Sequence, residues 1–103
     1  MTEQTWFVLL HTPGPAIEPG QNVFDHPGIG EHFAFLHRMA DAGRLVAAGP
    51  FGDASGEGMT VLRADDVEHA DRLAREDDQA VVSGVLDVRV RPWQVVMSAV
   101  PGA

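Results

Sequence analysis

Two helix-like segments alternate with strand-like segments in this 103-residue chain, and their order constrains the fold more than any single motif. Apolar residues at helical spacing predict helices over residues 28–42 and from residue 67 onward. Runs of strand-forming residues lie at 6–10, 45–48, 59–62 and 85–91, with a short further piece at 93–97 after Pro92. The order βαββαβ predicts a ferredoxin-like α+β fold, an antiparallel sheet with both helices on one face.

The other face of such a sheet has no helix to cover it. A chain of this length has room for one modest core, so we expect a single domain over residues 1–103. Because no second layer remains within the chain, the usual cover is another copy of the same sheet. The sequence therefore predicts a homodimer that closes sheet to sheet.

Residues 12–27 contain four prolines and two glycines and are expected to form a long loop. Loops of this length within a small domain are often functional. We therefore expect residues 12–27 to form a lid over a site.

Charge and composition exclude several classes of function. Fifteen acidic and seven basic residues give a net charge of −8, which disfavours nucleic acid and anionic membrane surfaces as partners. The chain has no cysteine, which excludes disulfides, thiol catalysis and thiolate metal sites and fits a cytoplasmic protein. The first apolar run is only five residues long and follows no basic leader, so neither a signal peptide nor a membrane span is expected.

The first predicted helix carries two of the five histidines. Its expected buried stripe consists of Ile29, Phe33, Leu36 and Ala40. At about 100° per residue from Ile29, His32 lies near −60°, beside the stripe, and His37 near +80°, at the polar border. An imidazole at a pocket wall can act as general acid or base near neutral pH, whereas a core histidine is held by a carbonyl or water. Periodicity alone leaves both readings of His32 open.

The remaining histidines give weaker signals. His11 alternates with Phe7 and Leu9 and should share their face of the sheet, where it can reach a pocket. Surface positions are expected for His26, His37 and His69. A helical metal pair needs a spacing of three or four residues, but His32 and His37 are five apart, about 140° around the helix. No metal site is therefore predicted.

The second predicted helix begins at an N-cap, either Asp65 or Asp66. Its expected buried face consists of Val67, Ala70 and Ala74. If the helix continues to its end, Asp78 lies near +20° from Val67 on the apolar face, whereas Asp77 points away. A proton-transfer histidine is commonly oriented by a carboxylate, which makes Asp78 the candidate partner of His32. The alternative is a solvated run of charge at a helix end.

Several features follow one another along the chain in a fixed order: His32, GRLVAAGP at 43–50, Asp78, Gly84 and VRPW at 90–93. In this respect residues 7–96 resemble the YCII-related family of dimeric α/β-barrel proteins. The resemblance implies a ferredoxin-like subunit, a dimer formed through the sheets, and an active site centred on a histidine and an aspartate, here His32 and Asp78. Family members usually follow the aspartate with proline and an aromatic residue, whereas Gln79 and Ala80 follow here, and this leaves Asp77 as a rival.

The family resemblance implies proton-transfer chemistry, such as elimination from a chlorinated hydroquinone ring. We therefore expect a small lyase or isomerase without cofactor, acting on a small, partly apolar substrate that is aromatic or enolisable. His32 would move the proton, Asp78 would orient it, and His11, Gly49 and Pro50 would contact the substrate. One alternative is a non-catalytic ligand-binding or accessory domain that keeps the pair for stability, and another is a cofactor-free oxygenase with a Trp or Asn beside the pocket.

Overall fold

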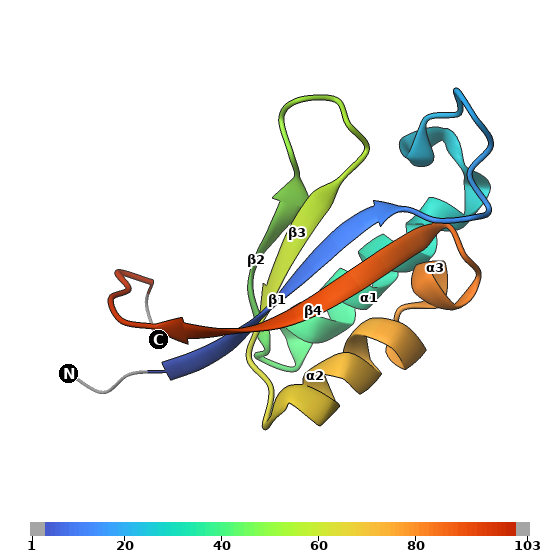
Figure 1. Cartoon of the computed structure of the whole chain (residues 1–103). Helices are drawn as coiled ribbons and strands as arrows, with labels where there is room; N and C mark the ends of the chain where they lie inside the picture. The colour runs from blue at the N-terminus through green and yellow to red at the C-terminus, as the bar shows by residue number, and fades with distance from the viewer. Residues whose placement is uncertain (1–3, 101–103) are drawn as a thin grey trace.

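The computed structural model describes residues 4–100, and its centre is a four-stranded antiparallel sheet (Figure 1). The strands are β1 (Gln4–Pro13), β2 (Leu45–Pro50), β3 (Gly58–Leu62) and β4 (Leu86–Val95). They lie in the order β2-β3-β1-β4, and every neighbouring pair is antiparallel. This is the predicted ferredoxin-like α+β arrangement, with the first strand at the centre and the last at an edge.

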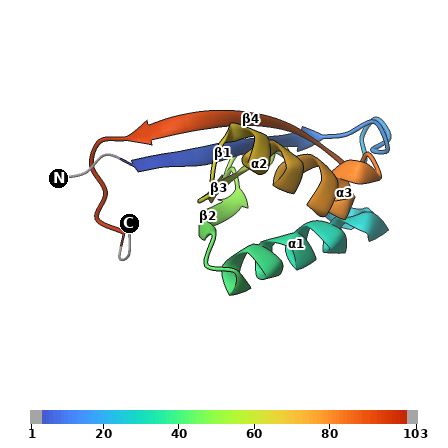
Figure 2. The same ribbon diagram turned by 90° about the horizontal axis from the view of Figure 1, so that it is seen from below.

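The helices lie on one face of the sheet, as Figure 2 shows. They are α1 (Gly30–Asp41), α2 (Val67–Arg72), a π-helical turn η3 (Leu73–Asp77) and α3 (Gln79–Val82). Two short 3-10 turns, η1 (Val23–Asp25) and η2 (Pro27–Ile29), lead into α1. The main core between sheet and helices is apolar and contains Phe7, Leu9, Phe35, Met39, Leu62, Ala70, Ala74 and Val88. Within residues 4–100, no helix has the length and apolar character needed to cross a membrane.

The buried face of α1 differs from the predicted stripe. Phe35 and Met39 are buried, whereas Phe33 is 47% exposed and Ala40 is also exposed. The helix is apolar at so many positions that more than one stripe fits its period. Packing against the sheet selects the side on which Phe35 and Met39 lie, and His32 belongs to that side.

The second helix is broken rather than continuous. The π-helical turn η3 ends at Asp77, and Asp78 is extended, with φ −81° and ψ 102°. Asp78 then caps the new helix α3. The predicted buried face is correct for Ala70 and Ala74, but Val67, the first residue of α2, is 44% exposed.

The last strand is longer than predicted. The sequence predicts separate pieces at 85–91 and 93–97 on either side of Pro92, but β4 runs without a break from Leu86 to Val95. Pro92 pairs with Phe7 of β1. Because β4 is an edge strand, a residue without an N–H group is tolerated there when that position faces away from the partner strand.

The expected loop 12–27 is irregular over most of its length but has regular structure at both ends. β1 continues to Pro13, and the chain beyond it is held by backbone hydrogen bonds from Gly14 N to Val85 O and from Ala16 N to Gly84 O, both 2.9 Å. Gly84 has a φ of +81°, which favours glycine at the end of α3. Val23 of η1 is buried in a second apolar cluster. Closure of this segment as a lid stays a prediction.

The sheet face opposite the helices carries aromatic side chains. Trp6 and Trp93 are cross-strand partners whose ring centroids lie 5.9 Å apart, edge to face. Trp6 is buried with Val61 and Val95, but Trp93 is 47% exposed. This face is therefore partly apolar and open in the single chain.

Candidate functional site

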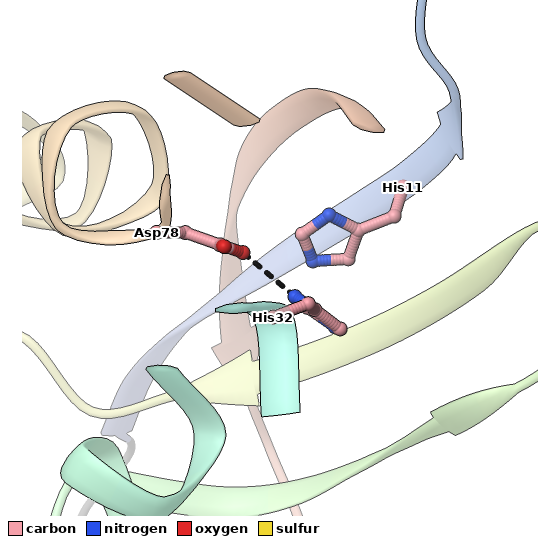
Figure 3. Close-up of side chains that lie close together, drawn as sticks. All are labelled: His11, His32 and Asp78. Atoms are coloured by element: carbon pink, nitrogen blue, oxygen red, sulfur yellow. Dashed lines mark hydrogen bonds and ion pairs between the residues drawn. The ribbon is translucent and has the colours of Figure 1, made fainter. Parts of the chain in front are cut away.

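His32 of α1 and Asp78 of the helix break form a direct hydrogen bond. Nδ1 of His32 lies 2.6 Å from Oδ2 of Asp78 (Figure 3). The His32 side chain is 13% exposed and that of Asp78 is completely buried. Because an ionised carboxylate can only accept, Nδ1 is the donor, and the lone pair of the neutral ring lies on Nε2.

The second oxygen of Asp78 holds the local backbone. Oδ1 accepts a hydrogen bond from the N–H group of Ala80 at 3.0 Å, the usual bond of an N-cap aspartate. Asp78 thus turns inward because it begins α3, and not because α2 continues with an unbroken twist. The helical period predicts the inward carboxylate correctly but for a wrong reason. The rival Asp77 is 40% exposed and pairs with Arg38 instead.

His11 of β1 lies close to both His32 and Asp78, as Figure 3 shows. The two rings are 4.6 Å apart between centroids at an angle of 66°. His11 is buried, as its alternation with Phe7 and Leu9 predicted, and its Nε2 lies 3.3 Å from Oγ1 of Thr60. Burial, reinforced by the charge that His32 can carry, lowers the pKa of His11 to about 4, so this ring is neutral at physiological pH.

A cavity of about 50 Å³ opens beside the two histidines. Its lining includes His11, His32, Gly49 and Pro50, the positions selected from the sequence. Apolar wall residues that sequence reasoning missed are Val23, Phe24, Ile29, Phe33, Leu36 and Met59. The rings of Phe24 and Phe33 are exposed, but the sequence predicted a buried Phe33 and gave no sign of the exposure of Phe24, so no local pattern marked this wall.

The YCII-related domain family matches residues 5–94 of this chain. The chain belongs to the YCII-related family. In Bacillus subtilis (strain 168), the uncharacterized protein YjpA is 33% identical over 72 residues, which cover 70% of this chain and 82% of YjpA. The predicted family is therefore confirmed, and the site described above lies within the YCII-related domain.

Three side chains of this YCII-related domain form a potential metal-ligating group. His11, His32 and Asp78 each offer one ligand atom, and these atoms lie within 4.8 Å of one another. The sequence argued against a metal site because His32 and His37 have the wrong spacing on one helix. That argument does not apply to ligands that come from three separate elements. Two histidines and a carboxylate are a known donor set for zinc and iron. Here, however, the hydrogen bond already joins two of the three residues, and an ion would have to replace its proton.

The remaining histidines lie outside the cavity lining of the YCII-related domain. His37 is exposed, as predicted. His26 and His69 are partly buried, and their Nδ1 atoms accept backbone hydrogen bonds from Gly28 at 2.9 Å and from Asp65 at 3.1 Å. Both therefore stabilise local turns.

Proposed function

We propose that this YCII-related protein is a small cofactor-independent enzyme of the lyase or isomerase type, in which His32 transfers a proton to or from the substrate. The observation that carries this proposal is the 2.6 Å bond from His32 to the buried Asp78 at the wall of a cavity. A base held in one tautomer and partly open to a pocket is the arrangement that general acid–base catalysis needs.

Asp78 has two effects on the proposed catalyst. By accepting from Nδ1, its carboxylate keeps the lone pair of His32 on Nε2, the nitrogen that receives the substrate proton. When the ring becomes an imidazolium, the adjacent negative charge stabilises it in surroundings where water contributes little. Asp78 is therefore a positioning and electrostatic partner of the proposed base.

The cavity favours a small and largely apolar substrate. Its volume is well below the roughly 300 Å³ at which sites for drug-sized ligands begin. Phe24 and Phe33 offer ring faces, which suit an aromatic or enolisable compound. Within the described residues, no arginine lines the cavity, so a strongly anionic substrate would find no counter-charge. We assign substrate contacts to His11, Gly49 and Pro50.

Hydrogen–deuterium exchange at carbon tests the proposal and does not require the product to be known. Small phenols and enolisable ketones are incubated with the protein in D₂O, and loss of carbon-bound protons is followed by NMR. His32→Ala should reduce the accelerated exchange by about 10²- to 10⁴-fold, the usual contribution of a general base. The exposed His37→Ala is the matched control and should retain full exchange. Undiminished exchange in His32→Ala would remove His32 from the mechanism.

A non-catalytic ligand-binding or accessory domain is the second candidate. The observation that favours it is the structural task of Asp78, whose second oxygen caps α3 whether or not a reaction occurs. In that case His32→Ala lowers the melting temperature, while neither variant nor wild-type protein accelerates exchange in any compound. The oxygenase alternative has less support, because neither Trp nor Asn lines the cavity among residues 4–100.

We also propose that the protein acts as a homodimer in the cytoplasm. The half-exposed Trp93 lies on the sheet face without helices, beside the partly buried Val8 and Leu10. A second copy of this face would remove these apolar side chains from water. The absence of cysteine supports a reducing compartment.

A further inference from the structure

The break between η3 and α3 is the feature that brings Asp78 to His32, and it creates a local problem. Where a helix stops, the last carbonyl groups lose the N–H partners that the next turn would supply. Here the chain leaves the π-helical turn at Asp77 and is extended at Asp78. The carbonyl groups just before Asp78 need other donors if the break is to be held in one geometry.

Two side chains supply those donors. Nε2 of Gln79 donates to the carbonyl oxygen of Glu76 at 3.1 Å. Nη2 of Arg38 donates to the carbonyl oxygen of Asp77 at 2.7 Å, a short and charge-assisted bond. Nε of Arg38 also lies 3.4 Å from the carboxylate of Asp77, but both of these side chains are more than one-third exposed. An exposed ion pair at this distance contributes little, so the bond to the backbone is the stronger restraint.

The two donors differ in what they connect. Gln79 belongs to α3, so its bond closes a loop within the break itself. Arg38 belongs to α1, the helix that carries His32. Its guanidinium therefore joins the backbone next to Asp78 to the same helix from which His32 projects, over a separation of 39 residues.

We propose that Arg38 is a positioning residue, whose bond to the Asp77 carbonyl fixes the helix break and thereby holds the Asp78 carboxylate against Nδ1 of His32. Arg38 does not line the cavity and has no contact with a substrate in this role. The inference deepens the proposed function and rests on it for any catalytic consequence. The position of Asp78 can nevertheless be tested without turnover.

The test compares substitutions that remove the same ion pair in two ways. Arg38→Ala removes the bond to the backbone carbonyl, whereas Asp77→Ala removes the carboxylate and leaves that carbonyl in place. Arg75→Ala is the control for charge, because it also removes an exposed arginine, one that pairs with Asp71 at 2.7 Å. The readout is solvent exchange of the His32 Nδ1 proton in ¹⁵N-labelled protein, because a proton held by a buried carboxylate is protected from water.

We expect Arg38→Ala to accelerate this exchange at least about tenfold, since loss of a charge-assisted hydrogen bond is typically of that size or larger. Asp77→Ala and Arg75→Ala should stay within about twofold of wild type. Unchanged exchange in Arg38→Ala overturns the proposal, as does equal acceleration in Arg38→Ala and Asp77→Ala, which would assign the effect to the ion pair. If Arg38→Ala does not fold, Arg38→Met keeps an unbranched stem without donors and replaces it. Either overturning result is distinct from failure of the catalytic proposal, which would appear as undiminished exchange of substrate carbon-bound protons in His32→Ala.

Discussion

Asp77 and Asp78 are consecutive in the chain but have opposite surroundings: 40% of the Asp77 side chain is exposed, whereas Asp78 is completely buried. The first pairs with Arg38 at the surface, and the second bonds to His32 and to the backbone of Ala80. The extended backbone at Asp78 produces this division.

The difference between these two carboxylates predicts unequal effects on stability. Asp78→Ala removes an N-cap bond and the acceptor of a buried histidine, so the free energy of unfolding should fall by about 2–4 kcal/mol. Asp77→Ala should change it by less than about 1 kcal/mol. Urea unfolding at pH 7 measures both, and similar losses in the two variants would contradict the assignment of Asp78 as the structural carboxylate.

Asp78→Asn should distinguish the effect of Asp78 on the His32 tautomer from its effect on the stability of the protein. The amide oxygen can still cap α3, while its NH₂ group faces Nδ1 of His32 and requires that nitrogen to accept. We therefore expect the neutral ring to switch to the tautomer protonated on Nε2, with carbon exchange reduced at least about 10²-fold. ¹⁵N chemical shifts of the imidazole report the tautomer, and an unchanged tautomer would show that Asp78 does not control it.

Acid should destabilise the protein partly through His11. The pKa of this ring falls from 6.5 to about 4 on folding, so the unfolded chain binds the proton more readily between these values. Stability from this source is complete above about pH 6.5 and decreases as the pH falls towards 4, by about 3 kcal/mol in total. Unfolding of His11→Phe should show a smaller loss between pH 7 and pH 4.5 than the wild type. His37→Phe should lose as much as wild type, and an equal loss in all three proteins would exclude His11 as the cause.

Trp93 provides a test of the proposed dimer. Trp93→Ser removes a half-exposed aromatic ring from the open sheet face and should weaken self-association at least about tenfold. Val82→Ser, a substitution at a 58% exposed position on α3, should leave it unchanged. Sedimentation velocity across a concentration series distinguishes these results. Identical behaviour of wild type and Trp93→Ser would argue against this face as the interface.

Two glycines at the ends of β2 and β3 should respond differently to alanine. A Cβ atom at Gly58 would lie 2.8 Å from the carbonyl oxygen of Gly49, which is backbone and cannot move freely, whereas a Cβ at Gly49 meets nothing within 4 Å. Gly58→Ala should therefore lower the free energy of unfolding by about 1–3 kcal/mol and shift the cavity edge formed by Gly49 and Pro50. Gly49→Ala should be nearly neutral. Thermal unfolding of the pair, together with the backbone amide shift of residue 49, checks both expectations.

The sequence predicts the order of strands and helices along the chain, because alternation and helical period indicate which segments form each type of element. It also selects His32 and Asp78, although the helical period behind the choice of Asp78 does not continue through the helix break. His11 follows directly from its alternation with Phe7 and Leu9, and the structure agrees. The register of α1 could not be fixed in the same way. A helix with apolar residues on several sides acquires a buried face only when the sheet is present, and Phe35 rather than Phe33 then lies inside.

The helix break at Asp78 was beyond the reach of local patterns. A side chain from another helix, Arg38, bonds to the Asp77 carbonyl at the break from 39 residues away, and no period relates the two. The cavity wall is also assembled from distant segments, because Phe24 and Met59 both line it. Such contacts arise only after the strands and helices have packed.

The two hydrogen bonds of the Asp78 carboxylate affect which residue can indicate function in related chains. The aspartate at this position caps a helix, so folding alone favours it whether or not the proposed reaction takes place. Among residues 4–100, the polar contact of the His32 ring is with Asp78 itself, and no backbone group bonds to this ring. Under the proposed function, the histidine rather than the aspartate would therefore mark the relatives that share the reaction.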